Sequence, residues 1–227
     1  MKKGKLIVFT GIDGSGKSTQ AKLLAEALEN YGSVRYTWSR WKPMLLKPFI
    51  YFFKKIYMIK KMFLSFSYSD KNDKEYFQFV SSKRKIMSVP GFKFLWFWLA
   101  FFDYYWQLYN KVIKFLKNYD FIICDRYIYD FMVDMAVNFC SLDLVISKTI
   151  KIFNSKIVPM GDICIFINIP PEIAFARKND IFSIHYLQER AELYSQIAKV
   201  FNMKTFDGTL DICDLHKEIL NFCKSFI

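Results

Sequence analysis

The sequence predicts an α/β fold in which helices flank a five-stranded parallel sheet. Apolar runs at 5–10, 34–38, 120–126, 162–169 and 203–207 are typical of strands that are covered on both faces. Helical patterns lie between these runs, and such alternation favours parallel strands joined by helical crossovers. The stretch 39–120 is too long for one crossover, so we expect an enlarged helical segment between the second and third strands.

The first strand and helix are the clearest elements. The run "KLIVFT" at 5–10 is short, apolar and bounded by glycine. Ala21, Leu24 and Leu28 then recur at helical spacing, and Gly32 provides a stop, so we expect a helix over 17–30. This strand-turn-helix unit opens the chain.

Composition limits the class of protein. With 227 residues and 53% hydrophobic content, the chain can bury a full core, and we expect a single domain over 1–227. Five cysteines without a C-x-x-C pair indicate neither a disulfide framework nor a zinc site, which favours a cytoplasmic location. The apolar run 94–102 is about half the ~20 residues that a spanning helix needs. A net charge of +12 predicts attraction to polyanions such as nucleotides.

A glycine-rich stretch, "FTGIDGSGKST" at 9–19, joins the first strand to the first helix. Its pattern, Gly11-x-x-x-x-Gly16-Lys17-Ser18, in this context is that of a P-loop. Glycines let backbone N–H groups converge on phosphate oxygens, and the start of the helix adds positive charge there. We expect Lys17, exposed on the loop, to reach the β and γ phosphates of a triphosphate, and the Ser18 hydroxyl to bind Mg²⁺.

Two charged residues end the third predicted strand, in "IICDRY". Ligands of open α/β sheets bind at the carboxyl ends of the strands. Asp125 there is expected to hold Mg²⁺ through water or to orient the loop. Arg126 offers a bidentate fork for a phosphate on the acceptor.

Beyond the P-loop, several segments occur in the order and spacing of one family. "IICDRY", "INIPPEIAFAR", "YLQERAELYSQIA" and "FDGTLDICDLHKEI", together with the P-loop and the helix after it, resemble thymidylate kinase and its relatives among the nucleoside monophosphate kinases. The resemblance covers roughly 4–38 and 100–222. It implies a P-loop NTPase fold, Mg²⁺ with ATP as cosubstrate, a nucleotide acceptor, and a homodimer.

The resemblance also implies roles for single residues. Asp13 matches the loop carboxylate near the transferred phosphoryl group, and Phe101 matches the aromatic ring that stacks on the acceptor base. A short lid over ATP is expected at 177–186, and Arg190 follows it on the next helix. The catalytic set is Asp13, Lys17, Arg126 and Arg177. The ATP-binding set is Gly11, Gly14, Ser15, Gly16, Lys17, Ser18, Thr19 and Arg177. The acceptor-binding set is Arg126, Phe101, Tyr105 and Arg40, and the metal set is Ser18 and Asp125.

The acceptor side departs from the family pattern. Tyr105 stands where the family has an arginine that reads thymine, and "SRWKP" replaces an arginine-glutamate-proline turn. "IYDFMVDM" replaces a serine-rich segment, and the lid carries one arginine and one lysine in place of an arginine series. Phosphorylation of dTMP is the leading reaction. The alternatives are the same chemistry on another nucleotide, a sugar or a membrane-presented glycolipid, and a nucleotide-dependent switch with little turnover.

The segment 44–66 is basic and aromatic at once. Lys47, Lys54 and Lys61 recur every seven residues, opposite an apolar face. The segment is most simply a helix that packs on the sheet or on a dimer partner, but the pattern also suits peripheral contact with an anionic membrane. No recognition fold for nucleic acid accompanies it, so no specific nucleic-acid partner is expected.

Overall fold

The computed structural model describes residues 4–48, 51, 81, 84–85, 91–178, 180–181 and 183–226. It contains a sheet of five parallel strands in the order β2-β3-β1-β4-β5, so the predicted fold class is confirmed. The strands are β1 (Lys5–Thr10), β2 (Val34–Trp38), β3 (Phe121–Asp125), β4 (Ile163–Asn168) and β5 (Lys204–Asp207). All five predicted strands are present, with ends that differ by at most one residue.

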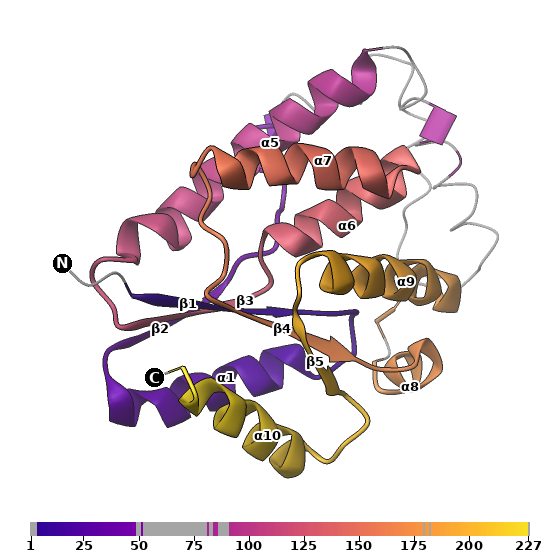
Figure 1. Cartoon of the computed structure of the whole chain (residues 1–227). Coiled ribbons are helices and arrows are strands. Elements are labelled where there is room, and N and C mark those ends of the chain that lie inside the picture. Colours follow the sequence, from indigo (N-terminus) through magenta and orange to yellow (C-terminus); the bar gives the residue numbers. More distant parts are fainter. Residues whose placement is uncertain are drawn as a thin grey trace.

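Helices cover both faces of the sheet (Figure 1). One face carries α5 (Phe92–Lys111), α6 (Ile128–Phe139), α7 (Leu142–Asn154) and α9 (Ile184–Val200), and the other carries α1 (Lys17–Leu28) and α10 (Ile212–Lys224). The short helix α8 (Pro171–Ala176) lies at the carboxyl end of β4. Two 3-10 turns, η1 (Glu29–Tyr31) and η2 (Ile113–Phe115), follow α1 and α5.

The predicted enlargement between the second and third strands is only partly described. Between β2 and β3 the long helix α5 and the turn η2 are present, in agreement with the expectation of helices there. Most of the basic-aromatic segment 44–66 lies outside the described residues, which include only 44–48 and 51 of it. Its proposed membrane, dimer or packing role therefore stays a prediction. In the described part of the chain, no helix combines the length and apolarity needed to cross a bilayer.

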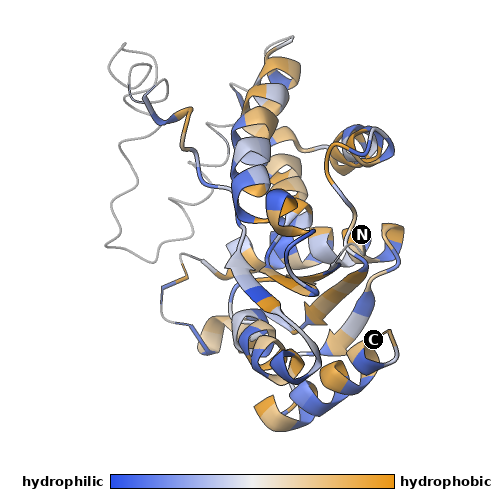
Figure 2. Cartoon of the chain, turned by 90° about the vertical axis from the view of Figure 1, so that its left-hand side faces the viewer, coloured by the Kyte–Doolittle hydropathy of each residue, from blue (hydrophilic) through white to orange (hydrophobic). Residues whose placement is uncertain are grey.

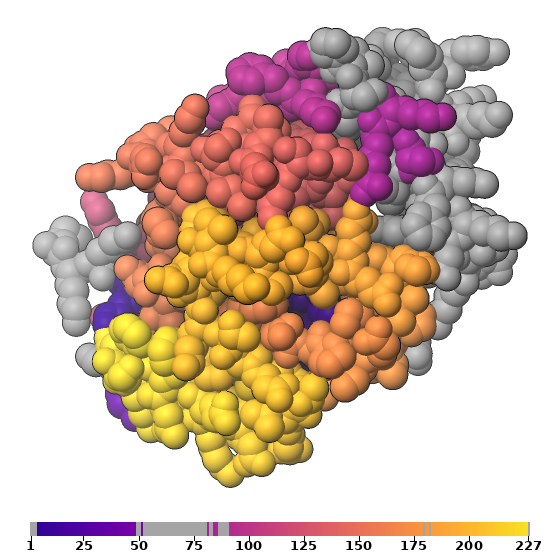
Figure 3. Space-filling view, turned by 45° about the vertical axis from the view of Figure 1, so that its right-hand side comes forward, coloured from indigo at the N-terminus to yellow at the C-terminus, as the bar shows by residue number. Residues whose placement is uncertain are grey.

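Two apolar clusters hold the layers together, one on each face of the sheet. Alternate residues of β3 divide between them: Ile122 and Cys124 face the α5–α9 side, and Phe121 and Ile123 face α1 and α10. Figure 2 shows hydrophobic strands in the middle of the sheet, whereas the edge strands, β2 and β5, and the helices are mixed. On the face shown in Figure 3, the C-terminal half covers most of the N-terminal residues.

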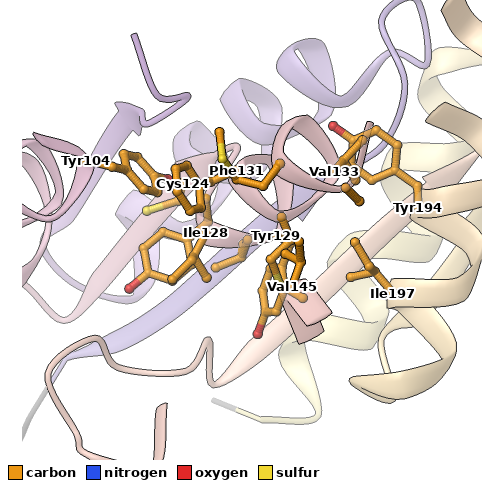
Figure 4. Close-up of a cluster of buried hydrophobic side chains, with 14 of the residues drawn as sticks. Tyr104, Cys124, Ile128, Tyr129, Phe131, Val133, Val145, Tyr194 and Ile197 are labelled. Atoms are coloured by element: carbon orange, nitrogen blue, oxygen red, sulfur yellow. The ribbon is translucent and has the colours of Figure 1, made fainter. Parts of the chain in front are cut away.

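The larger cluster is rich in aromatic side chains. Figure 4 shows part of this cluster, with Cys124 of β3 beside Tyr104 of α5 and Phe131 of α6, and with Tyr194 of α9 at the other side of the view. The Tyr104 and Phe131 rings stack with centroids 5.2 Å apart, and the Tyr104 hydroxyl donates to the Ser39 carbonyl at 2.7 Å. This bond ties α5 to the segment that leaves β2.

Strand register brings together the segments that follow three strands. Asp125 pairs with Phe9 of β1 on one side and with Trp38 of β2 on the other. The glycine-rich loop after β1, Arg126 after β3 and Arg40 after β2 therefore leave the sheet side by side. The Arg126 N–H extends the ladder by donating to the Phe9 carbonyl at 3.0 Å.

Phe101 belongs to the core of α5. Its side chain is 2% exposed and stacks on Phe97 with a centroid separation of 6.4 Å, whereas the next residue, Phe102, is 60% exposed. Phe97 and Phe101 are four residues apart and so lie on one face of α5, which places this ring in the core. Its stacking on an acceptor base stays a prediction.

The two adjacent phenylalanines make a matched test. Phe101→Ala should lower the free energy of unfolding by about 3–5 kcal/mol, because it leaves a cavity in the core. Phe102→Ala should change it by only about 0.5 kcal/mol, because the ring is mostly in solvent. Urea denaturation measures both values. Equal effects of the two substitutions would contradict the placement of Phe101.

Candidate functional site

The loop between β1 and α1 requires its glycines for different reasons. Gly14 has φ +87° and Gly16 has φ +85°, in the left-handed region that disfavours side chains. A Cβ on Gly14 would lie 2.4 Å from the carbonyl oxygen of Ala174 in α8, whereas a Cβ on Gly16 would meet no atom within 4 Å. Gly11 is also confined, since its Cβ would lie 2.6 Å from the Ile167 carbonyl oxygen of β4. The loop is thus pressed against β4 and α8, with Gly16 left open.

The N-terminus of α1 opens directly into this loop. The helix begins at Lys17, has no acidic residue in its first turn, and has no side-chain hydrogen bond at its N-cap, Gly16. Ser18 and Thr19 are exposed, so this end presents backbone N–H groups and hydroxyls together. Such an end attracts anions, phosphate above all.

A pocket of about 370 Å³ lies in front of this helix end. Most of the predicted site residues meet there. It is lined by Asp13, Gly14, Gly16, Lys17, Ser18, Thr19, Trp38, Arg40, Arg126, Arg177 and Lys178.

Asp13 is the meeting point of the charges in the pocket. Arg126 Nη2 forms an ion pair with Asp13 Oδ1, and Arg40 Nη1 approaches Asp13 Oδ2 at 3.4 Å. The Tyr186 hydroxyl donates to Oδ2 at 3.2 Å, and Lys17 Nζ lies 3.9 Å from Oδ1. Burial favours the neutral acid, but Arg126, Lys17 and Arg40 outweigh it and hold the pKa of Asp13 well below its ordinary value. Asp13 is therefore an anion throughout the physiological pH range.

Lys17 is buried, contrary to the expectation of an exposed loop lysine. Its side chain is 4% exposed, and Nζ donates to the Ile12 carbonyl at 2.7 Å. Burial, followed by the positive charge of Arg126, lowers the pKa of Lys17 to about 7. The ammonium group of Lys17 is therefore turned into the loop, toward the Ile12 carbonyl, in this conformation.

Arg126 is anchored from behind by a buried carboxylate. Arg126 Nη1 donates to Asp130 Oδ1 at 2.6 Å, and the Tyr194 hydroxyl lies 3.3 Å from the same nitrogen. Burial opposes the charge, yet Asp130, Tyr194 and Asp13 together raise the pKa of Arg126. Its φ of +74° is uncommon for a residue with a side chain, and this turn directs the guanidinium toward Asp13.

Four residues of this network were not singled out from the sequence: Asp130, Asp134, Tyr186 and Tyr194. Asp130 lies in the first turn of α6, but Arg126 precedes that helix and has a φ of +74°, so helical spacing does not connect the two. Tyr186 and Tyr194 come from α9, far along the chain, and no local pattern connects them to the loop.

Ser18 and Asp125 fit the oxygen chemistry that Mg²⁺ prefers. The Ser18 hydroxyl is exposed at the pocket wall. Asp125 is 1% exposed and does not line the pocket; its Oδ2 accepts from the Tyr36 hydroxyl at 3.1 Å. Among the described residues, its Oδ1 has no hydrogen-bond partner, and its charge acts on Lys17. Ser18 therefore suits direct binding of a metal ion, and Asp125 suits contact through water.

The predicted lid carries two cations at the pocket wall. Arg177 Nη1 donates to the Gly208 carbonyl at 2.8 Å, and Lys178 Nζ lies 3.3 Å from Asp180 Oδ2. Of the predicted lid, 177–186, the residues from Ile184 onward belong to α9, where the Ser183 hydroxyl caps the helix. The lid itself stays a prediction. Residues 179 and 182 lie outside the described part.

The predicted acceptor residues separate into two groups. Arg40 and Arg126 reach the pocket. Phe101 and Tyr105 are on α5, neither lines the pocket, and the Tyr105 ring packs against the larger cluster. Arg190, placed by the resemblance on the helix after the lid, pairs with Asp134 at 3.3 Å and lies over the Tyr186 ring.

Together, the parallel sheet, the loop after its central strand and the cationic pocket in front of α1 are the features of a P-loop nucleotide-binding fold. No family model matches the chain. It is 26% identical to a thymidylate kinase of Plasmodium falciparum (isolate 3D7), over 96% of this chain and 89% of that protein. It is 23% identical to a probable thymidylate kinase of Pyrococcus abyssi, over 98% and 97%.

A third similarity is local. The chain is 70% identical to a thymidylate kinase of Pelotomaculum thermopropionicum over a stretch of 30 residues. This stretch is 13% of this chain and 14% of that protein. The two longer similarities extend over nearly the whole chain. The chain is therefore similar to thymidylate kinases over nearly its whole length.

Substitution of two loop glycines by alanine tests the geometry of the loop. Each substitution should cost about 1–2 kcal/mol of stability, because each places a side chain in the left-handed region. Gly14→Ala should cost more than Gly16→Ala, because only its Cβ meets a backbone oxygen, that of Ala174. Urea denaturation of both variants measures the difference. A Gly16→Ala variant as unstable as Gly14→Ala would show that α8 does not press on the loop.

Lys17→Met tests the buried charge through pH. Because the pKa of Lys17 in the folded protein is about 7 against 10.5 ordinarily, the unfolded chain binds the proton more tightly. The parent should therefore gain stability as the pH rises from about 7 toward 10.5, relative to Lys17→Met. The variant should be the more stable protein below pH 7 and should lose ATP binding. Unfolding free energies of both proteins across this range measure the effect; a constant difference would refute the buried charge.

Proposed function

We propose that this protein is a Mg²⁺-dependent phosphotransferase that moves the γ-phosphoryl group of ATP to a nucleoside monophosphate, with dTMP as the leading acceptor and dTDP as the product. One observation carries the proposal. The phosphate-binding end of α1 and the guanidinium groups of Arg126 and Arg40 meet in one pocket around Asp13. Donor and acceptor phosphates can therefore lie next to each other.

The donor half of the site is formed by the loop and by α1. Backbone N–H groups of the loop and of the first helical turn would bind the phosphates of ATP. Lys17 would turn from the Ile12 carbonyl to the β and γ phosphates, whose negative charge favours its protonated form. Ser18 would hold Mg²⁺ directly and Asp125 through water, and the metal ion supplies charge neutralisation on the phosphates. Arg177 and Lys178 stand at the wall to offset charge on the transferred group.

The acceptor half needs no general base. The second pKa of a phosphate monoester is about 6, so its attacking oxygen is already ionised at neutral pH. Asp13 is also ionised, and Arg126 and Arg40 hold it in place. In this proposal the residues act by position and charge, as phosphoryl transfer generally requires.

The arginine pair also bears on the class of acceptor. Guanidinium groups bind phosphate through paired charge-assisted hydrogen bonds. Two of them at the acceptor side favour an acceptor that already carries phosphate over a phosphate-free sugar. The choice of dTMP comes from the likeness to proteins named thymidylate kinase, and Tyr105 in place of the thymine-reading arginine leaves other monophosphates as the alternative.

A screen for ADP release tests the function. Purified protein with Mg²⁺ and ATP is offered dTMP, other nucleoside monophosphates and phosphate-free sugars. The proposal expects turnover with monophosphates, fastest with dTMP, and none above background with the sugars. Turnover with a sugar alone, or with no acceptor at all, would contradict it. The location in the cytoplasm, the homodimer and a peripheral membrane contact stay predictions beside this one.

Arg40 offers a substitution that removes one acceptor contact. Arg40→Gln should raise the KM for dTMP about 10- to 100-fold, the effect of losing one charge-assisted hydrogen bond. The KM for ATP should stay within about twofold, because Arg40 lies on the side of Arg126. Arg35→Gln is the matched control, since Arg35 lies on β2 over the Phe115 ring and does not line the pocket. An unchanged KM for dTMP in Arg40→Gln would remove Arg40 from the acceptor site.

A further inference from the structure

Helix α6 carries two carboxylates one turn apart, and each contacts a different pocket arginine. Asp130 Oδ1 accepts from Arg126 Nη1 at 2.6 Å, and Asp134 Oδ1 lies 3.5 Å from Arg40 Nη2. Residues four apart lie on the same face of a helix, so α6 presents both carboxylates to the same side. The two arginines come from different strand ends, yet they share this helix as a support.

The opposite ends of the two guanidinium groups converge. Arg126 Nη2 binds Asp13 Oδ1 and Arg40 Nη1 approaches Asp13 Oδ2, so each oxygen of one carboxylate faces one arginine. Each arginine therefore has a rear contact on α6 and a front contact at the pocket. A tetrahedral phosphate offers the same paired oxygens as the Asp13 carboxylate, with more charge.

The rear contacts are themselves fixed. Asp130 is 1% exposed and also accepts from the Tyr194 hydroxyl at 2.6 Å, the Thr10 hydroxyl at 3.2 Å and the Tyr127 N–H at 3.1 Å. Asp134 also accepts from Arg190 Nη2 at 3.3 Å. Neither carboxylate lines the pocket, so neither is placed to touch a ligand.

We infer that Asp130 and Asp134 are positioning residues, which aim Arg126 and Arg40 at one anion, the phosphate of the acceptor. This inference rests on the proposed function for the identity of that phosphate. The two carboxylates stand in "IYDFMVDM", the segment that departs from the serine-rich family pattern. The departure thus supplies two carboxylates that hold the arginines.

Inorganic phosphate is the probe, because it tests the arginine pair whatever the acceptor is. The protein is first saturated with Mg²⁺ and a non-hydrolysable ATP analogue, so that the loop is occupied, and phosphate is then titrated by calorimetry. Asp134→Asn should weaken phosphate binding about tenfold, because Arg40 loses its charged support. Asp134→Glu, which keeps the charge, should recover most of the affinity. Asp214→Asn, on the exposed first turn of α10, is the matched control and should bind as the parent does.

The sign of the effect separates positioning from simple electrostatics. Removing a negative charge beside an anion site should tighten phosphate binding if Asp134 acted only through its field. Unchanged or tighter binding in Asp134→Asn would overturn the inference, and so would a parent that binds no phosphate when the loop is filled. The midpoint of thermal unfolding should fall in Asp134→Asn, because Arg40 and Arg190 both lose this partner, so binding is measured well below that midpoint. Affinity for the ATP analogue should stay unchanged, which a general loss of folded protein would not allow.

Asp130→Asn should weaken phosphate binding further, but it also removes the capping box at the start of α6. The Asp134 variants therefore carry the test of positioning.

Failure of the proposed function has a different signature. In that case phosphate binds the parent and is lost in Asp134→Asn, while no nucleoside monophosphate supports ADP release. The arginine supports would then serve another phosphate-bearing ligand.

Discussion

The ion pairs of Asp13 are the interaction on which the rest of the site depends. Three cations, Lys17, Arg126 and Arg40, meet at the carboxyl edge of the sheet, where burial makes their mutual repulsion costly. One carboxylate from the loop lies among all three. The fold brings this about by register, because β1, β3 and β2 lie next to one another and the segments after them leave the sheet together. Without Asp13, the loop and the two arginines would repel one another.

The same arrangement assembles positive charge in the pocket before any ligand binds. The carboxylates behind the two arginines lie on α6, outside the pocket. Burial, followed by the charge of Arg126, lowers the pKa of Lys17, and an anion in the pocket would favour its protonated form. Preorganised charge of this kind stabilises transferred phosphoryl groups without reorganisation at the moment of reaction.

Much of the fold could be predicted from the sequence because it depends on local patterns. Buried parallel strands are apolar throughout, so the five strands were found, and the spacing of Gly11, Gly16 and Lys17 placed the loop. The burial of Lys17 could not be predicted, because it depends on the conformation of the loop. That conformation places the Ile12 carbonyl within hydrogen-bond distance of the lysine Nζ. For Phe101, a resemblance gives the residue type but not the direction of the ring, which the packing of α5 decides. The support from Tyr194 joins segments far apart in sequence, and only the tertiary structure shows it.

Two departures from the family pattern, the segment "IYDFMVDM" and Tyr105, lie in different places relative to the pocket. The replacement of a serine-rich segment by "IYDFMVDM" supplies the two carboxylates behind the arginines. Tyr105, where the family pattern has an arginine, does not line the pocket, so this departure leaves the pocket lining unchanged.

The most direct test of the account is a crystal structure of the protein with a dinucleotide in which an oligophosphate chain joins adenosine to thymidine. Such a ligand spans donor and acceptor positions at once. The adenosine-side phosphates should lie on the loop and the N-terminus of α1, and the thymidine-side phosphate should lie between Arg126 and Arg40. A ligand that leaves this arginine pair bound only to Asp13, with its thymidine end elsewhere on the surface, would contradict the central claim that the pocket joins a phosphate donor to a phosphate acceptor.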